Sequence, residues 1–223
     1  MSFTLRFGPV LDAWRQLLDG IWVTLQLSAA AMLIGLVVAV VCAWAKVFGP
    51  RWAGWIVNVY VEVIRNTPFL VQLFFIFFGL PAVGLRLSPD AAALAALVVN
   101  VGAYATEIIR AGIQSVQKGQ IEAGLALGLR PLQVFRLVIL KPALRAVYPA
   151  LTSQFILLML STSVVSAISA DDLTSVANNI QSRTFTSFEV YIVVTLIYLG
   201  LSFLFAALFR AIDRRVFAYP VAR

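Results

Sequence analysis

Long apolar runs without charge are the feature that most restricts how this chain can fold. The first run, Ile21 to Trp44, extends over about 24 residues, and a helix needs about 20 apolar residues to cross a bilayer. Similar runs recur along the sequence, so that 61% of the residues are hydrophobic and only 12% are charged, against about a quarter in soluble domains. We therefore predict an all-α, polytopic membrane protein in which residues 1–223 form a single transmembrane domain.

The 223 residues leave room for about five spans joined by short connections. Four spans are predicted where one apolar run lies between polar flanks, at residues 21–44, 90–113, 143–169 and 190–209. Residues 1–20 mix charges of both signs with Leu and Trp, which favours an amphipathic helix at the membrane interface over a cleaved signal peptide. The polar segment 171–189 is expected to form a loop or a short helix outside the membrane.

Residues 52–85 are too long for one span, since about 34 helical residues would cover roughly 50 Å against a hydrocarbon core near 30 Å. A break is predicted within them at Arg65, Asn66, Thr67 and Pro68. Proline removes a backbone donor and disfavours the helical conformation in the residue before it. We therefore expect an interfacial or entering helix up to Ile64, and a second span from Phe69 to Phe78 and beyond.

The basic residues predict the orientation. The net charge is +7, with 17 Lys and Arg against 10 Asp and Glu, and cytoplasmic loops of membrane proteins collect Lys and Arg. Lys46 and Arg51 follow the first span, and Arg210, Arg214 and Arg215 follow the last. This pattern places the N-terminus outside and the C-terminus in the cytoplasm, and it makes the charge a sign of topology and not of nucleic-acid binding.

The composition also excludes several kinds of chemistry. The chain has no histidine and a single cysteine, Cys42, so it can hold neither a His-based zinc site, nor a Ser-His-Asp triad, nor an internal disulfide. A GxxxxGK[ST] loop for ATP is also missing from the sequence. We expect no enzymatic activity and no cofactor on this chain.

Residues 115–145 form the one long charge-bearing interruption between the spans. A pattern of small residues, Ala123, Gly124 and Ala126, precedes Gly128, which can take the positive φ of a helix C-terminal cap. Pro131 suits the first turn of a second helix. The segment is predicted to be two helices with a tight turn between them, whose small outer face lets another protein approach. The alternative is an ordinary amphipathic loop.

Polar side chains recur at helical spacing inside two predicted spans. Asn100, Tyr104 and Glu107 are spaced i, i+4, i+7 and share one face of the third span. A carboxylate near membrane depth needs a partner, and Arg110 is one turn away. The fourth span carries Gln154, Thr162 and Ser163. For both spans a solute pathway and plain structural pairing or interhelical hydrogen bonding remain alternatives.

The residues of the charged segment resemble a known family. The resemblance is carried by Glu122, Ala123 and Gly124, then Gly128, then Val138, Ile139 and Leu140 with Pro142 behind them. This pattern is similar to the EAA loop of membrane subunits of bacterial ABC importers. Residues 110–129 and 60–81 look more narrowly like the permeases of polar amino acid importers of the histidine, glutamate and arginine type.

The resemblance implies a membrane subunit of the bacterial inner membrane that takes up a polar amino acid or similar small zwitterion. It implies four kinds of partner: two ATP-binding subunits, which would hold ATP and Mg; a second, identical or homologous permease; an external substrate-binding protein; and the amino acid. The coupling helix in residues 115–145 would dock on the ATPase through Glu122, Ala123, Gly124, Gly128 and Pro131. The solute pathway would involve Asn100, Tyr104, Glu107, Gln154, Thr162 and Ser163. A channel-like or scaffolding membrane protein is the alternative.

The sequence departs from the family pattern at three places. Residues 115–145 are called the coupling loop below. Near its end, Pro142 is displaced by one residue from the position of the family's proline, and we expect a turn there before the fourth span. Arg130 stands where a capping Ser or Thr is common. Residues 160–164 keep Thr-Ser but lack the charge that many members carry, so the partner permease is expected to hold most of the substrate site.

Overall fold

The computed structural model of the chain describes residues 5–216, and over this range it contains helices and no strands. The α-helices are α1 Gly8–Asp12, α2 Trp14–Phe48, α3 Arg51–Arg65, α4 Phe69–Phe74, α5 Pro89–Gln114, α6 Lys118–Ala126, α7 Pro131–Val134, α8 Leu140–Ser161, α9 Leu173–Thr184 and α10 Ser187–Val216. Shorter π- and 3₁₀-helical turns continue α4, α7 and α8, at Phe75–Gly79, Leu80–Val83, Phe135–Ile139 and Thr162–Ile168.

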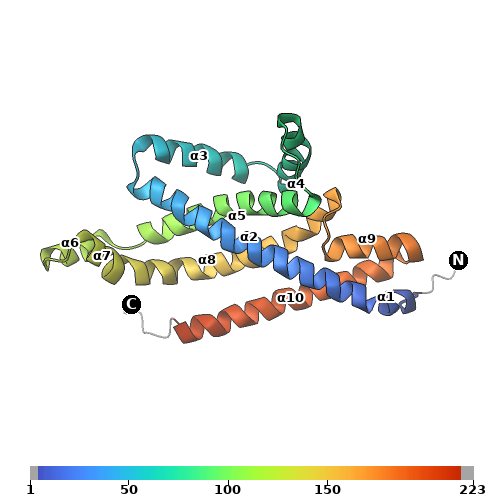
Figure 1. Cartoon of the computed structure of the whole chain (residues 1–223). Helices are drawn as coiled ribbons and strands as arrows, with labels where there is room; N and C mark the ends of the chain where they lie inside the picture. Colours follow the sequence, from blue (N-terminus) through green and yellow to red (C-terminus); the bar gives the residue numbers. More distant parts are fainter. Residues whose placement is uncertain (1–4, 217–223) are drawn as a thin grey trace.

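Four helical runs are long and apolar enough to cross a membrane: α2, α5, the run Pro131–Ile168 that contains α8, and α10. A fifth span results if the bent pair α3 and α4 counts as one. Figure 1 shows the long helices lying lengthwise beside one another, with α6 and α7 at one end of the bundle and α1 and α9 at the other. The prediction of an all-α protein with about five spans is therefore confirmed.

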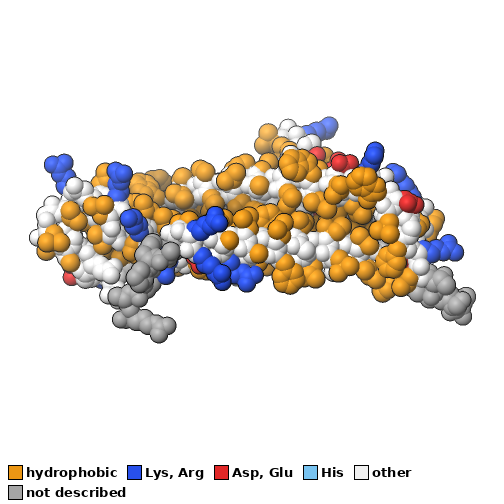
Figure 2. Space-filling model, turned by 90° about the horizontal axis from the view of Figure 1, so that it is seen from below, with side chains coloured by type: hydrophobic (Ala, Val, Ile, Leu, Met, Phe, Trp, Pro, Cys, Tyr) orange, Lys and Arg blue, Asp and Glu red, His pale blue; other side chains and the backbone are white. Residues whose placement is uncertain are grey.

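Helix α5 lies at the centre of the bundle and packs closely against α2 and α8. Its inward faces carry small buried residues, among them Ala92, Ala93, Ala96, Ala103 and Ala105. Inside a membrane the hydrophobic effect does not drive helices together, and small residues let helix backbones approach closely enough to pack well. Apolar side chains cover the middle of the bundle, and charged side chains gather toward its two ends (Figure 2), as a bilayer requires.

The predicted break is confirmed, and it is sharper than a simple kink. Helix α3 ends at Arg65, and α4 begins after Pro68, which has an extended backbone. The segment Phe69–Val83 is bent by 110° away from α3. In Figure 1 α4 stands across the direction of α3 and not in line with it.

The first helix differs from the prediction. The only separate short helix among the described residues before Gly20 is α1, because α2 already begins at Trp14 and continues to Phe48. Two residues explain the continuity. Leu17 is buried among apolar side chains of α9 and α10, and Gly20 lies against the backbone of Leu173, where an added Cβ would be 3.0 Å from the Leu173 Cα. Residues 1–4 of the predicted interfacial helix lie outside the described range.

The prediction of a turn at Pro142 is also wrong, because the chain is helical without interruption from Pro131 to Ile168. A π-helical turn at Phe135–Ile139 ends three residues before Pro142. A π turn is wider than an α turn and shifts the hydrogen-bond register by one residue. This turn makes room for a proline ring that would otherwise clash with the preceding turn of an α-helix.

The close approach of α2 and α5 leads to a first prediction. A Cβ on Gly35 would lie 2.3 Å from the Val101 side chain, whereas one on Gly200 in α10 meets no atom within 4 Å. Gly35→Leu is therefore expected to destabilise the folded protein by about 1–3 kcal/mol through overpacking, and Gly200→Leu to leave it near wild type. Thermal unfolding of the two purified variants in one detergent measures the difference. Equal melting temperatures would contradict the close approach.

Candidate functional site

The segment after α5 folds into two helices around a glycine turn, as the sequence predicts. Gly128 has φ +79°, its N–H donates to the Leu125 carbonyl at 2.9 Å, and the Leu129 N–H donates to the Gly124 carbonyl at 3.2 Å. These two bonds together form a Schellman motif, which satisfies the last carbonyls of α6. Only glycine adopts this backbone conformation without strain.

The start of α7 is capped by Gln133, which is not among the predicted site residues. Pro131 is the first helical residue, as predicted, and Arg130 before it has an extended backbone. The Gln133 side-chain oxygen accepts a hydrogen bond from the Arg130 N–H at 2.8 Å. The signal was present in the sequence, because a Glu or Gln at the third helical position reaches back to the N-cap in this way.

Gly124 does not lie on the outer face of the coupling loop, contrary to expectation. It is the buried residue of α6, and its Cβ position is 3.4 Å from the side chains of both Val134 and Val138. The face opposite is open, with Glu122, Ala123, Gly128 and Pro131 exposed. Gly124 thus lets the two helices of the loop pack together, and the other four residues remain available to a partner.

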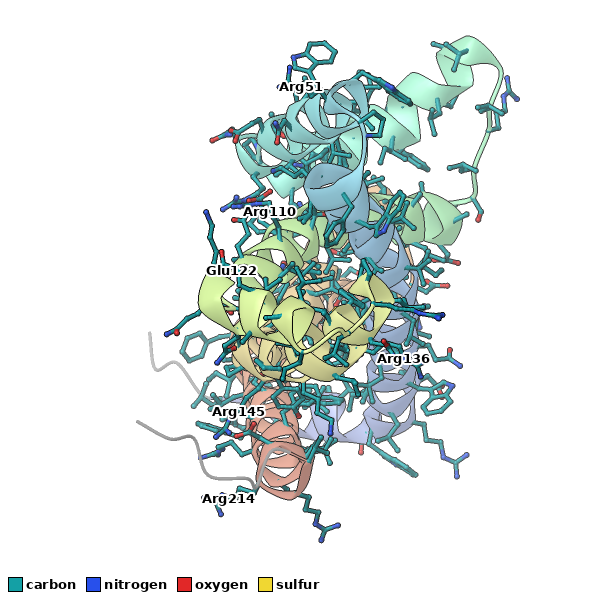
Figure 3. The ribbon with its side chains drawn as sticks, turned by 90° about the vertical axis from the view of Figure 1, so that its left-hand side faces the viewer. Arg51, Arg110, Glu122, Arg136, Arg145 and Arg214 are labelled. Carbon is teal, nitrogen blue, oxygen red and sulfur yellow. The ribbon has the colours of Figure 1, made fainter. Side chains whose placement is uncertain are left out.

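The coupling loop also exposes apolar side chains beyond those expected. Leu127 is 82% exposed and Leu132 is 68% exposed. They lie on either side of the turn at Gly128. Figure 3 looks at this end of the bundle, with Glu122 on α6 directed outward and Arg136 and Arg145 on the run that follows. An exposed surface of this kind, apolar with a charged rim, is typical of a protein-binding site.

The helix break is held in place by Gln72, which is not among the predicted site residues. The Gln72 amide nitrogen donates to the carbonyls of Ile64 at 2.7 Å and Thr67 at 3.0 Å. Its oxygen accepts from the Asn100 side chain at 3.0 Å. Gln72 is buried and satisfies carbonyls that the end of α3 leaves without a helical partner. Asn100 is thereby tied to the break.

Glu107 lies between two cations. It forms an ion pair with Arg110 at 2.8 Å, as its spacing predicts, and a second one with Lys46 of α2. The Lys46 partner could not be read from the sequence, since it is 61 residues away. One turn earlier, the Arg65 guanidinium lies 5.5 Å from the centre of the Tyr104 ring, a cation–π distance.

Arg65 of the break and the polar face of α5 meet at an open groove of about 480 Å³. Its polar lining consists of Arg65, Tyr104, Glu107, Arg110 and Ser115, and the small residues Ala146 and Ala150 of α8 form the opposite wall. The groove can therefore present both a carboxylate and guanidinium groups to a ligand with charges of both signs. Among residues 5–216, no group of three or more Cys, Asp or Glu side chains could hold a metal ion.

Comparisons with known proteins identify the family of the chain. A family model described as the binding-protein-dependent transport system inner membrane component matches residues 31–218. The chain belongs to this family. Two relatives are the L-cystine transport system permease protein TcyB of Bacillus subtilis (strain 168), 40% identical over 92% of this chain and 88% of that protein, and the glutamine transport system permease protein GlnP of Escherichia coli (strain K12), 37% identical over 90% of this chain and 92% of that protein.

A solved structure supports the family at the level of the fold. The crystal structure of an amino acid ABC transporter with histidines contains a chain with a TM-score of 0.90 and 36% sequence identity, over 96% of this chain and 100% of that one. This permease is thus a multi-pass membrane protein that shares a known ABC transporter fold over 96% of its chain.

The residues expected on the fourth span of the permease do not line the groove. Thr162 is buried and donates to the Met159 carbonyl at 2.8 Å, and Ser163 donates to the Leu160 carbonyl at 2.7 Å. Both therefore satisfy themselves on their own helix, as Ser and Thr often do. Gln154 is half-buried on α8. The structure brings Tyr104 and Glu107 together in the groove and places these three residues elsewhere.

At the opposite end of the permease, a buried carboxylate and the neighbouring backbone tie α9 to α10 and α2. Asp172 is fully buried and accepts hydrogen bonds from the N–H groups of Ser175 at 2.8 Å and Thr174 at 3.1 Å, and from the Tyr198 hydroxyl at 3.2 Å. The next N–H, of Leu173, donates to the Thr24 hydroxyl at 3.1 Å. Burial raises the pKa of Asp172, and the hydrogen bonds that it accepts oppose this rise only in part.

This raised pKa leads to a prediction of pH-dependent stability. A carboxyl that keeps its proton to higher pH when folded than when unfolded stabilises the fold at low pH, and this contribution is lost as the pH rises through the folded pKa. Asp172→Asn keeps the capping oxygen and removes the charge. Its melting temperature relative to wild type is expected to rise as the pH increases above the ordinary pKa of aspartate, near about 4.

The matched control for that experiment is Asp172→Ala, which removes the cap as well as the charge. The loss of an N-cap costs about 1 kcal/mol, so this variant is expected to be less stable than Asp172→Asn at every pH. A difference between Asp172→Asn and wild type that does not change with pH would show that folding does not raise the pKa of the Asp172 carboxyl.

Proposed function

We propose that this chain is the membrane-spanning subunit of an ATP-driven ABC importer for a polar amino acid or a similar small zwitterion. The observation that carries the proposal is the match over 96% of the chain to a subunit of an amino acid ABC transporter. Two of its relatives are named for cystine and glutamine, which are both zwitterions. The bacterial inner membrane is the corresponding location, with the N-terminus outside and the C-terminus in the cytoplasm.

In this proposal the coupling loop docks on a separate ATPase subunit, which holds ATP and Mg. Residues 115–145 offer a partner an exposed surface that includes Glu122, Ala123, Leu127, Gly128 and Pro131. One chain presents one such loop, so two permeases, identical or homologous, would bind two ATPases with twofold or pseudo-twofold symmetry. A binding protein would deliver the amino acid at the opposite end, near α9.

The experiment that tests the function is uptake by the reconstituted complex. The permease is purified with the subunits that accompany it, placed in liposomes with a candidate binding protein, and supplied with a panel of radiolabelled amino acids. Uptake of one polar amino acid that requires both ATP and the binding protein would support the proposal. Solute flux that persists without any nucleotide-binding subunit would support the channel-like alternative.

The solute pathway is proposed along the groove beside the helix break. A polar ligand near the membrane midplane needs fixed polar groups, and non-helical backbone is tolerated there where it lines a cavity. The break, Arg65 to Pro68, supplies such a backbone beside Asn100, Tyr104 and Glu107. Gln154, Thr162 and Ser163 remain pathway candidates from α8 and its extension, for a conformation in which that helix has moved.

A third prediction follows for these neutral polar groups. One hydrogen bond to a neutral group is worth about 0.5–1.5 kcal/mol net, so Asn100→Ala and Tyr104→Ala are each expected to weaken transport several-fold without abolishing it. Initial uptake rates over a range of substrate concentrations measure both apparent affinity and maximal rate. If alanine at Asn100, Tyr104 and Thr162 together changes neither quantity, the pathway lies in the other permease subunit.

A further inference from the structure

A second polar cavity lies at the coupling-loop end of the bundle, on the other side of the Glu107 ion pairs from the groove. It has a volume of about 530 Å³ and lies between the turn that joins α2 to α3 and the last turns of α5. The charged residues in its wall are Lys46, Arg51 and Arg110, and the neutral polar ones are Asn58 and Gln114. Figure 3 shows both Arg51 and Arg110 at this end of the molecule, with Arg110 between Arg51 and the helix that carries Glu122.

The cavity carries an excess of positive charge. Lys46 and Arg110 share the single carboxylate of Glu107, and Arg51 forms no ion pair with any residue in the described range 5–216. Three cations against one carboxylate leave a net formal charge of +2. Arg and Lys side chains that converge on a cavity match the oxygens of a phosphate, to which they donate charge-assisted hydrogen bonds.

The wall of the cavity continues into an apolar stripe on α3. Trp55 lines the cavity, and Trp52 beside it is equally exposed, at 68% each. Ile56, Val59 and Val63 follow at helical spacing, and each is at least 44% exposed. Tryptophan is enriched where a bilayer meets water, so the cavity lies at the depth of the lipid headgroups and the stripe at the depth of the acyl chains.

We propose that this cavity binds the phosphate headgroup of an anionic phospholipid, whose acyl chains lie along the apolar stripe of α3. Basic pockets between membrane helices on the cytoplasmic side are suited to anionic headgroups. A lipid bound here connects the α2–α3 turn to the end of α5, directly before the coupling loop begins at Ser115. The site therefore links lipid composition to the segment that precedes the loop. This inference does not depend on the transported solute.

The test is lipid binding to the purified complex, measured by native mass spectrometry after delipidation in detergent. Phosphatidylglycerol, phosphatidylcholine and inorganic phosphate are the three probes. Arg51→Gln removes the unpaired cation of the cavity. Gly54→Leu fills the cavity, since a Cβ at Gly54 comes no closer than 4.0 Å to Lys46 and the rest of the side chain then occupies the space. The matched control is Arg214→Gln, an exposed arginine at the same end of the molecule but outside the cavity.

Phosphatidylglycerol is expected to bind wild type and Arg214→Gln equally, and both more tightly than phosphatidylcholine. Arg51→Gln should bind it about fivefold more weakly, the factor expected for one basic residue near an anionic membrane surface, and Gly54→Leu more weakly still. Binding that is unchanged in Arg51→Gln and Gly54→Leu would overturn the proposal. An equal loss in Arg51→Gln and Arg214→Gln would indicate general surface attraction, and displacement of the lipid by inorganic phosphate would indicate a site for the free anion. Either result would overturn the lipid site.

Gel-filtration profiles and retention of the accompanying subunits serve as the check on folding. If Arg51→Gln does not fold, Gly54→Leu and Arg214→Gln still decide the question, because only the former alters the cavity. The proposal then fails if both of these variants retain phosphatidylglycerol to the same extent.

Discussion

Replacing Glu107 with alanine is expected to sharply reduce the amount of folded permease in the membrane. The substitution leaves Lys46 and Arg110 without their shared carboxylate, and the side chains of all three residues are at most 30% exposed. Removing one partner of a buried ion pair costs about 3–5 kcal/mol, and the partial exposure of this cluster places the expected loss at the lower end, near 3 kcal/mol. Expression level and melting temperature of the purified protein measure the effect.

A double substitution serves as the control. Lys46→Met removes one of the two cations, so the combination of Lys46→Met with Glu107→Ala is expected to be more stable than Glu107→Ala alone. Glu107→Gln separates the two roles that remain open for the carboxylate. A structural role predicts lower expression of this variant, whereas normal expression with altered solute selectivity would show that Glu107 serves the solute.

Uptake is expected to be lost when the coupling loop is distorted, even though the protein still inserts into the membrane. Gly128→Pro places a residue with fixed negative φ at a position with φ +79° and removes the N–H that donates to Leu125. A proline in an incompatible position costs about 3 kcal/mol. Gly124→Trp has the same consequence for another reason, because its ring cannot fit between Val134 and Val138. ATP-driven uptake and ATP hydrolysis by the reconstituted complex measure the coupling.

The chain offers a control within the same helix. Gly119 in α6 has no atom within 4 Å of its Cβ position, so Gly119→Ala is expected to fold and transport like wild type. The apolar spans are unchanged in all three variants, and their amounts in the membrane should be similar. A well-expressed Gly124→Trp variant with wild-type uptake would contradict the close packing of the coupling loop.

The elements that the sequence predicts correctly are those set by local signals. Each of these signals determines the structure of the residues next to it. They are the charge-free runs of span length, the proline after Arg65-Asn66-Thr67, and the glycine and proline around the coupling turn. The i, i+3 spacing of Glu107 and Arg110 is likewise local, and the structure contains that ion pair.

The features that the sequence does not predict depend on contacts between distant segments. Lys46 reaches Glu107 from another helix, and Gln72 reaches both Asn100 and the break. No periodicity indicates which small residue of α6 faces inward, so the burial of Gly124 emerges only from the packing of α7 against it. A π turn accompanies the continuous helix at Pro142, and a π turn has no recognisable sequence pattern.

That continuity has a mechanical consequence. From Pro131, beside the coupling turn, to Ile168, beside α9, the backbone is one helical rod of 38 residues, which corresponds to roughly 57 Å at 1.5 Å per residue. A tilt of only about 5° at one end of such a rod displaces the other end by about 5 Å. A tilt of the whole run therefore carries a displacement from the α6–α7 end of the bundle to the α9 end.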